Sequence, residues 1–172
     1  MKLFIIGPSG SGKTTIAKRI SSSLSIEATN LDDLFWINTP NSINTKRSNE
    51  ERTELLNRIL KKDKWIIEGA YVEWPLPAMK EADYIIHLNT PGIILTKRIW
   101  IRFLKRKMRI EQSNKKENIN SVMELIKWNR TQIGLIDKRV EKLEETGKAI
   151  IRIKRTNEIC KLIRDIKKVK AF

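Results

Sequence analysis

The fold of this chain is decided by Leu3-Phe4-Ile5-Ile6-Gly7-Pro8-Ser9-Gly10-Ser11-Gly12-Lys13-Thr14. The first four residues are a short apolar run typical of a buried parallel strand, and residues 14–24 carry apolar side chains at helical spacing. Residues 7–14 match the phosphate-loop pattern G-x-x-x-x-G-K-[ST]. Its glycines let backbone N–H groups converge on one anion, and the following helix adds the positive end of its dipole. The stretch predicts a strand, a phosphate-binding turn and a helix.

This loop supplies most of the candidate site residues. We expect Lys13 to reach the β- and γ-phosphates of ATP, and the Thr14 hydroxyl to be a ligand of the Mg²⁺ that bridges them. Contacts to the nucleotide are expected from Gly7, Ser9, Gly10, Ser11, Gly12, Lys13, Thr14 and Thr15. The alternative, a glycine-rich turn without a ligand, is disfavoured by the strand and helix on either side.

Length and composition fit one α/β domain over residues 1–172, with 40% hydrophobic residues to fill its core. No window approaches the roughly 18 uninterrupted apolar residues of a membrane span, and no charged leader with an apolar core precedes the first strand. We therefore expect a cytoplasmic protein with no membrane partner. The single cysteine, Cys160, and the single histidine, His87, exclude an intrachain disulfide and a cysteine or histidine metal cluster. We interpret Cys160 as a buried, inert thiol and His87 as a strand residue.

The net charge of +15 is concentrated in the second half of the chain. Residues 1–92 hold 12 Lys and Arg against 11 Asp and Glu, whereas residues 93–172 hold 23 against 9. Such asymmetry favours phosphate-bearing partners, whether nucleotides or a nucleic acid. A lysine-rich surface without a specific partner explains most of these charges equally well.

Apolar runs alternate with amphipathic segments along the chain. The runs predict strands near residues 3–6, 26–31, 65–67, 84–88 and 149–153, and the segments predict helices near 12–24, 49–62, 91–109, 117–145 and 156–170. This alternation indicates a three-layer α/β sandwich around a five-stranded parallel sheet. The polar residues 111–120 predict a mobile segment, which together with its flanking helices would form a lid at about 103–130. Residues 38–49 predict a loop.

Acidic side chains follow two of the predicted strands, at the edge of the sheet where ligands bind. Asp32 and Asp33 follow the second strand, and Glu68 ends the third. We expect Glu68 to hold Mg²⁺ through water and Asp32 to act on the acceptor in catalysis, with Asp33 the weaker candidate. The alternatives are a solvated carboxylate for Glu68 and a helix N-cap for Asp32.

The helix predicted after Pro91 carries two arginines one turn apart, Arg98 and Arg102. A guanidinium stacks on a base and grips phosphate oxygens with two N–H groups. We assign Arg98 to nucleotide binding and Arg102 to catalysis. The other basic residues of this region fit a solvated helix face, with Arg106, Arg109 and Arg130 as weaker candidates for the site.

Several further motifs resemble one bacterial family: Leu31-Asp32-x-Leu-x-Trp36, Trp65-Ile-Ile-Glu-Gly-x-Tyr71, Ala82-Asp83-Tyr-Ile-Ile and the helix with Arg98 and Arg102. Over residues 1 to about 165 the chain is similar to the FlaR-related DNA topology modulation proteins, of the adenylate-kinase-like P-loop kinase group. The resemblance implies a P-loop NTPase sheet in the order 2-3-1-4-5. The spacing of Pro91, Arg98 and Arg102 is that of adenylate kinases, whereas Asn89 and Gly92 depart from the pattern around the proline.

Two functions follow from these residues. The favoured one is a kinase that moves the γ-phosphate of ATP, with Mg²⁺, to a small-molecule acceptor, such as a nucleoside monophosphate. Trp36, Tyr71 and Trp74 would wall the acceptor pocket, or else be ordinary core and rim aromatics. The alternative is a regulatory NTPase linked to DNA topology or nucleic-acid binding. It is less favoured because the basic residues lack interleaved aromatics and no helix-turn-helix or zinc-finger pattern occurs.

Overall fold

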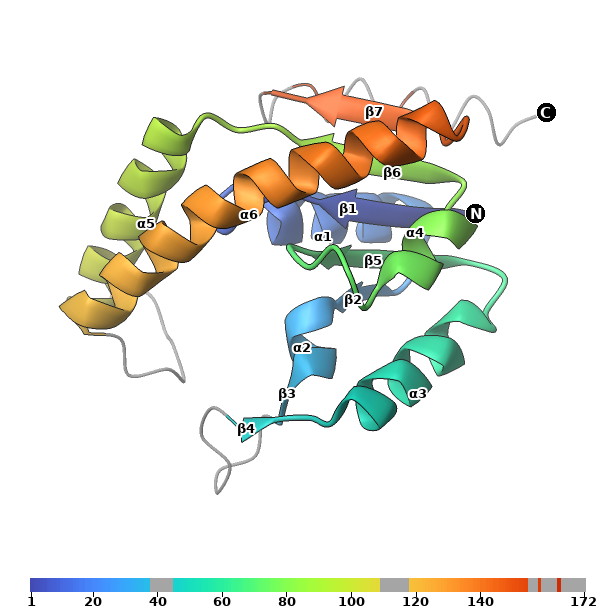
Figure 1. Ribbon diagram of the computed structural model, residues 1–172, viewed down its shortest axis with the longest axis horizontal. Helices are drawn as coiled ribbons and strands as arrows, with labels where there is room; N and C mark the ends of the chain where they lie inside the picture. Colours follow the sequence, from blue (N-terminus) through green and yellow to red (C-terminus); the bar gives the residue numbers. More distant parts are fainter. Residues whose placement is uncertain (38–44, 109–117, 155–157, 159–163, 165–172) are drawn as a thin grey trace.

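The computed structural model describes residues 1–37, 45–108, 118–154, 158 and 164. Its centre is a five-stranded parallel sheet in the order β2-β5-β1-β6-β7 (Figure 1). The strands are β1 (Lys2–Ile6), β2 (Ala28–Asn30), β5 (Trp65–Gly69), β6 (Tyr84–Leu88) and β7 (Ile150–Ile153). Numbered among themselves in chain order, these strands have the order 2-3-1-4-5, so the predicted fold class and sheet order are confirmed.

Alternate side chains of β1 build two cores, because successive residues of a strand point to opposite faces. Leu3 and Ile5 pack against α1 (Lys13–Leu24) on one face of the sheet. Phe4 and Ile6 belong to a larger core on the other face, which α3 (Asn49–Leu60), α4 (Leu76–Glu81) and α6 (Ile119–Glu145) cover. Figure 1 shows α1 behind the sheet and α6 in front of it. The three layers expected from the sequence are therefore present.

The segment after β2 differs from the prediction. The second strand is shorter than residues 26–31, because α2 (Leu31–Phe35) begins directly after it. The side chain of Asn30 caps this helix by accepting a 2.8 Å hydrogen bond from the Asp32 N–H. The alternative of Asp32 as the N-cap is thus wrong, and the Asp32 carboxylate is left for other contacts.

Two short strands follow α2. β3 (Trp36–Ile37) pairs antiparallel with β4 (Thr45–Lys46). A loop is predicted for residues 38–49. The prediction is wrong for residues 45–46, which form β4, and for residue 49, which begins α3. Residues 38–44 lie outside the described part of the chain.

Beyond the edge of the sheet, α5 (Gly92–Lys107) packs against the first half of α6 (Figure 1). A small separate core joins the two helices through Ile99, Phe103, Val122 and Ile126. Of the predicted mobile segment, residues 111–117 lie outside the described residues, and 119–120 already belong to α6, whose N-cap is Asn118. That this helical pair forms a lid at about 103–130 within a single domain stays a prediction.

His87 and the C-terminal segment are the last two features that the sequence predicts. His87 is buried on β6, as expected of a strand residue, and its Nε2 lies 3.4 Å from Asp137 Oδ1. The helix predicted for 156–170 and Cys160 fall almost wholly outside the described residues. Within the described ranges, none of the helices has the length and apolar character of a membrane span.

Candidate functional site

The phosphate loop joins β1 to α1 at the carboxyl edge of the sheet. Gly10 and Gly12 have φ angles of 83° and 97°, in the left-handed region that glycine adopts without strain. The Ser11 N–H donates to the Pro8 carbonyl oxygen at 3.2 Å, which closes the turn. Gly7 leaves no room for a side chain, since a Cβ there would lie 2.9 Å from Ser11 Oγ and 3.0 Å from Leu88 Cβ. These three glycines are needed for the turn itself.

Lys13 opens α1 with its ammonium folded toward the loop, where Nζ donates to the Pro8 carbonyl oxygen at 3.0 Å. Burial lowers the pKa of Lys13 from its ordinary value, and the positive charge of Arg102 adds to this effect. The charges of Glu68 and Asp32 oppose it and raise the pKa. Three other groups predicted for catalysis or metal binding, Asp32, Glu68 and Arg102, are therefore near enough to Lys13 to affect its pKa.

Thr14 and Glu68 meet directly, although they lie on different elements. Thr14 Oγ1 donates a 2.6 Å hydrogen bond to Glu68 Oε1. Glu68 faces Ile5 in the register of β5 with β1, which places its carboxylate at the base of the phosphate loop. The carboxyl is only 2% exposed, and burial raises its pKa, while the Thr14 hydrogen bond and the Lys13 charge hold it down.

This hydroxyl and carboxylate fit the expected Mg²⁺. Oxygen atoms of this kind are the ligands that Mg²⁺ takes in phosphate sites, where it also keeps several waters. The residues that would hold the ion are Thr14 directly and Glu68 through water, as the sequence predicts. Among the described residues, no group of three or more His, Cys, Asp or Glu side chains forms another metal site.

Two of the three arginines of α5, Arg98 and Arg102, lie near the phosphate loop. Arg98 Nη1 donates to the carbonyl oxygens of Gly10 and Ser11 at 3.2 and 3.3 Å. Arg102 lies near enough to Lys13 to lower its pKa. Of the weaker candidates, Arg106 is half-buried, Arg130 is exposed, and Arg109 falls outside the described residues. The structure thus brings Arg98 and Arg102 to the loop, and their roles toward a nucleotide stay predictions.

An aromatic cluster lies beside Asp32. The Tyr71 hydroxyl donates to Asp32 Oδ1 at 2.9 Å. The Tyr71 ring stacks on Phe35 with centroids 4.9 Å apart, and it lies 5.7 Å from the ring of Trp74. Trp36 meets Phe35 edge to face. We name Phe35, Trp36, Tyr71 and Trp74 the aromatic wall.

Arg52 of α3 is a site residue that the sequence reasoning missed. Its guanidinium carbon lies 4.5 Å from the Phe35 ring centroid and 5.6 Å from that of Trp74. Such stacking holds a cation on the face of an aromatic ring. No signal in the sequence joins Arg52 to this wall, because it is one of two arginines on a polar helix.

Asn129 of α6 is the second missed residue. It is 4% exposed, accepts from the Ser9 N–H at 2.9 Å and donates to the Ser9 carbonyl oxygen at 2.8 Å. A signal for it existed, because Asn129 follows Ile126 by three residues and precedes Ile133 by four, on the apolar stripe of the helix. A polar side chain in such a stripe needs a partner.

A comparison with known proteins shows which family the chain belongs to. An AAA domain family matches residues 3–121, which is more than half of the chain. The protein belongs to the AAA domain family. The match covers β1, the phosphate loop, the aromatic wall and all of α5, and ends just inside α6. It agrees with the predicted P-loop kinase-like group.

Among solved structures, this AAA domain resembles shikimate kinase from Acinetobacter baumannii in complex with shikimate. The TM-score is 0.58 at 14% sequence identity, and the similarity covers 99% of this chain and 92% of the other. At such identity the likeness shows a shared fold. No curated protein matches the sequence at a significant level. Neither the family nor this structure carries the FlaR-related name or a link to DNA topology.

Proposed function

We propose that this protein is an ATP-dependent phosphotransferase that moves the γ-phosphate to a small-molecule acceptor. The observation that carries the proposal is the closeness of the two sides of the site. Asn30 pairs with Glu68 in the register of β2 with β5, Asp32 follows Asn30 by two residues, and Glu68 accepts a hydrogen bond from Thr14 of the phosphate loop. An acceptor held at Asp32 is therefore adjacent to the phosphates held at Lys13.

Each residue then has a distinct role. Lys13 and Arg102 supply positive charge to the transferring phosphoryl group, and Arg98 binds the nucleotide beside Gly10 and Ser11. The Asp32 carboxylate, fixed by the Tyr71 hydroxyl, orients the acceptor and accepts its proton. Bound Mg²⁺, held by Thr14 and by Glu68 through water, would neutralise phosphate charge. Positioning of this kind is the main source of catalysis in phosphoryl transfer.

The acceptor side favours a molecule with a flat or apolar body and an anionic group. The aromatic wall offers ring faces and edges, and Arg52 adds a cation next to them. Nucleoside monophosphates and small hydroxy acids both have this combination. The shikimate kinase of the same fold is described with shikimate bound, which supports including such hydroxy acids among the acceptors to test.

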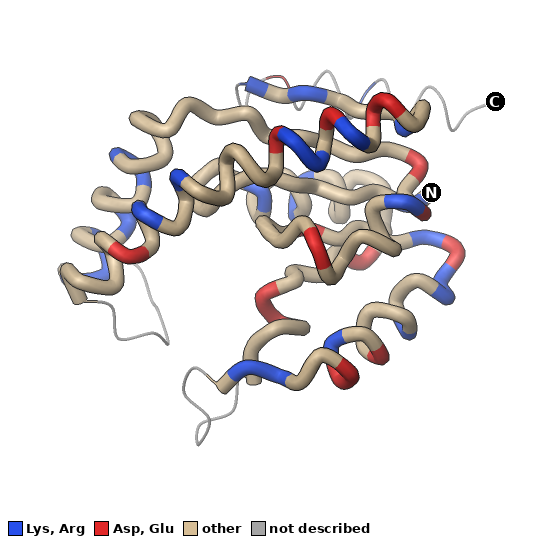
Figure 2. Tube along the Cα trace, in the orientation of Figure 1, with Lys and Arg blue, Asp and Glu red and all other residues tan. Residues whose placement is uncertain are grey.

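The alternative is a regulatory NTPase linked to DNA topology. Its support is the resemblance to the FlaR-related proteins and the positive charge of residues 93–172. Figure 2 shows basic residues along α5 and both charges along the second half of α6. The basic residues of α5 are Lys97, Arg98, Arg102, Lys105, Arg106 and Lys107, and this helix has no acidic residue. Arg98 already contacts the phosphate loop. The positive charge of α5 therefore favours the binding of nucleotide phosphates over the binding of a nucleic acid.

The first test measures ADP release from Mg·ATP by the purified protein, alone and with a panel of nucleoside monophosphates, nucleosides, sugars and hydroxy acids. Lys13→Ala serves as the blank. We expect release to increase strongly with one class of acceptor. Slow release that no acceptor changes contradicts the kinase and favours the regulatory NTPase. Salt-dependent DNA binding is then the next measurement.

A second variant separates transfer from nucleotide binding. Asp32→Asn keeps the size of the side chain and an oxygen for Tyr71, but removes the charge that faces the acceptor. We expect transfer to fall at least about a hundredfold, the lower end of the usual contribution of general acid–base catalysis, with ATP affinity nearly unchanged. The matched control is Asp63→Asn, an exposed aspartate that precedes β5. An equal loss in both variants contradicts the assigned role.

A further inference from the structure

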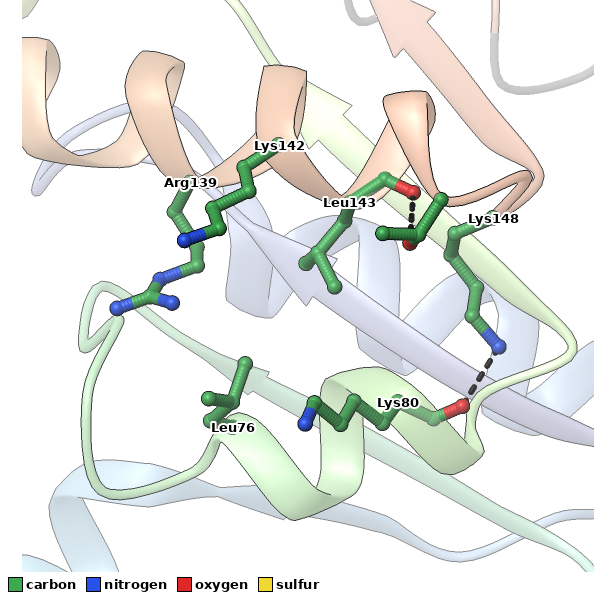
Figure 3. A pocket seen from close by; sticks show the side chains of 7 residues that line it. Leu76, Lys80, Arg139, Lys142, Leu143 and Lys148 are labelled. Atoms are coloured by element: carbon green, nitrogen blue, oxygen red, sulfur yellow. Dashed lines mark hydrogen bonds between the residues drawn. The ribbon is translucent and has the colours of Figure 1, made fainter.

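A hollow of about 410 Å³ lies between α4 and the C-terminal half of α6 (Figure 3). Its size is within the range of small-molecule pockets. Its lining includes Leu76, Lys80, Arg139, Lys142, Leu143 and Lys148. No acidic side chain is among the described residues that line it. Arg139 lies ten residues after Asn129, so along α6 the hollow is about 15 Å from the phosphate-loop contact.

Three of its cations have no ion-pair partner within the described part of the chain. The side chains of Lys80, Arg139 and Lys142 make no hydrogen bond or ion pair there. Two acidic residues of these helices pair outside the hollow, because Glu81 binds Lys2 at 3.1 Å and Glu144 binds Arg152 at 2.6 Å. Neither of these two carboxylates neutralises the cations of the hollow.

The fourth cation fixes the wall of the hollow. Lys148 Nζ donates to the carbonyl oxygens of Lys80 and Ala82, at 2.6 and 2.9 Å, and so closes the last turn of α4. Figure 3 shows Arg139 and Lys142 reaching from α6 toward α4, where Leu76 and Lys80 face them. The three unpaired cations therefore come from two helices, and the half-buried Lys148 ties the end of α4 to the segment that follows α6.

We propose that this hollow binds a small organic molecule with two or more carboxylate or phosphate groups. Lysine and arginine side chains on opposite walls can each bind a separate anionic group of the ligand. The planar guanidinium of Arg139 can bind one of these groups with two parallel hydrogen bonds. Leu76 and Leu143 give the hollow an apolar floor, which suits an organic body between the charges. A concave site of this size fits a small molecule better than the backbone of a nucleic acid. None of the residues assigned to phosphate transfer lines the hollow.

The test is calorimetric titration with citrate and, separately, with tripolyphosphate. Full-length Lys13→Ala protein is used, so that the phosphate loop does not contribute. The pocket variant adds Arg139→Gln and Lys142→Gln. The control variant adds Lys18→Gln and Arg19→Gln instead, which remove the same charges from exposed positions of α1, on the opposite face of the sheet. Thermal unfolding without ligand checks that both variants are folded.

We expect saturable one-to-one binding of at least one probe, weakened at least about tenfold in the pocket variant and less than about twofold in the control, since hydrogen bonds to charged groups contribute about 1.5–3 kcal/mol. The probe that binds identifies carboxylate or phosphate as the anionic group. Absence of saturable binding for both probes overturns the proposal. Equal weakening in the two variants also overturns it, because it indicates attraction to net charge alone.

Discussion

Asn129 holds the backbone of Ser9 with two hydrogen bonds, one in each direction, at 2.9 and 2.8 Å. The contact ties α6, the long helix that runs along the sheet and out to α5, to the second residue after Gly7. It uses the N–H of Ser9, which the sequence assigns to nucleotide binding. A nucleotide contact from this N–H therefore requires Asn129 to move, and that role of Ser9 stays a prediction.

Asn129→Ala is expected to destabilise the protein by about 2 kcal/mol, because it leaves the partly buried N–H and carbonyl of Ser9 without their partner. In a chain of this size this lowers the thermal midpoint by about 4–8 °C. Thermal unfolding followed by circular dichroism measures it. Asn57→Ala, an exposed asparagine on α3, is the control and should change little. Equal midpoints for both variants contradict a structural role for the contact.

Arg98→Gln is expected to weaken Mg·ATP binding about tenfold, since the guanidinium contributes charge-assisted hydrogen bonds at the loop. Lys97→Gln is the matched control, because it removes the same charge from the neighbouring residue of α5. The Lys97 side chain lines a hollow between α5 and α6. Fluorescence titration of both variants with a labelled nucleotide provides the comparison. Unchanged affinity in Arg98→Gln removes this arginine from the nucleotide site.

Glu68→Gln is expected to change how stability depends on pH. Burial raises the pKa of Glu68, and the charges of Asp32 and Asp33 add to the rise. Its proton is therefore bound more tightly in the folded chain. The stability that it contributes is complete below the ordinary glutamate pKa of about 4.3 and is lost as the pH rises through the raised folded value.

The glutamine keeps an oxygen for the Thr14 hydroxyl and cannot ionise. We expect the variant to match the stability of the wild type near pH 4 and to have a higher thermal midpoint than the wild type at pH 8. Glu124→Gln, an exposed glutamate of α6, controls for the loss of charge. A difference from wild type that stays constant with pH would falsify the sign of the shift.

Gly69→Ala and Gly134→Ala are expected to have opposite effects. A Cβ on Gly69 would lie 2.6 Å from Leu31 Cδ1 and 2.8 Å from Leu31 Cβ, so the added methyl should cost about 1–3 kcal/mol. A Cβ added at Gly134 in α6 would have no neighbouring atom within 4 Å, so alanine should stabilise the helix by about 0.5–1 kcal/mol. Urea unfolding of the two variants measures both changes. Two changes of the same sign contradict this packing.

The sequence predicts the regular part of the fold and misses its short elements. Long periodic segments identify α1, α3, α5 and α6, and apolar runs identify the strands. In contrast, α2, α4 and the β3–β4 pair have two to six residues each, which is too short for a hydrophobic period. These elements matter to the site, because α2 and β3 carry Phe35 and Trp36, half of the aromatic wall.

For the candidate site, the sequence by itself determines the phosphate loop. Its glycines, Lys13 and Thr14 lie within eight consecutive residues, so local backbone geometry places them whatever the rest of the chain does. Only the tertiary structure decides which distant groups meet the loop. Glu68 reaches Thr14 across 54 residues, and Asn129 reaches Ser9 across 120. Sheet register and helix packing make those contacts, and they depend on how every layer of the fold fits the others.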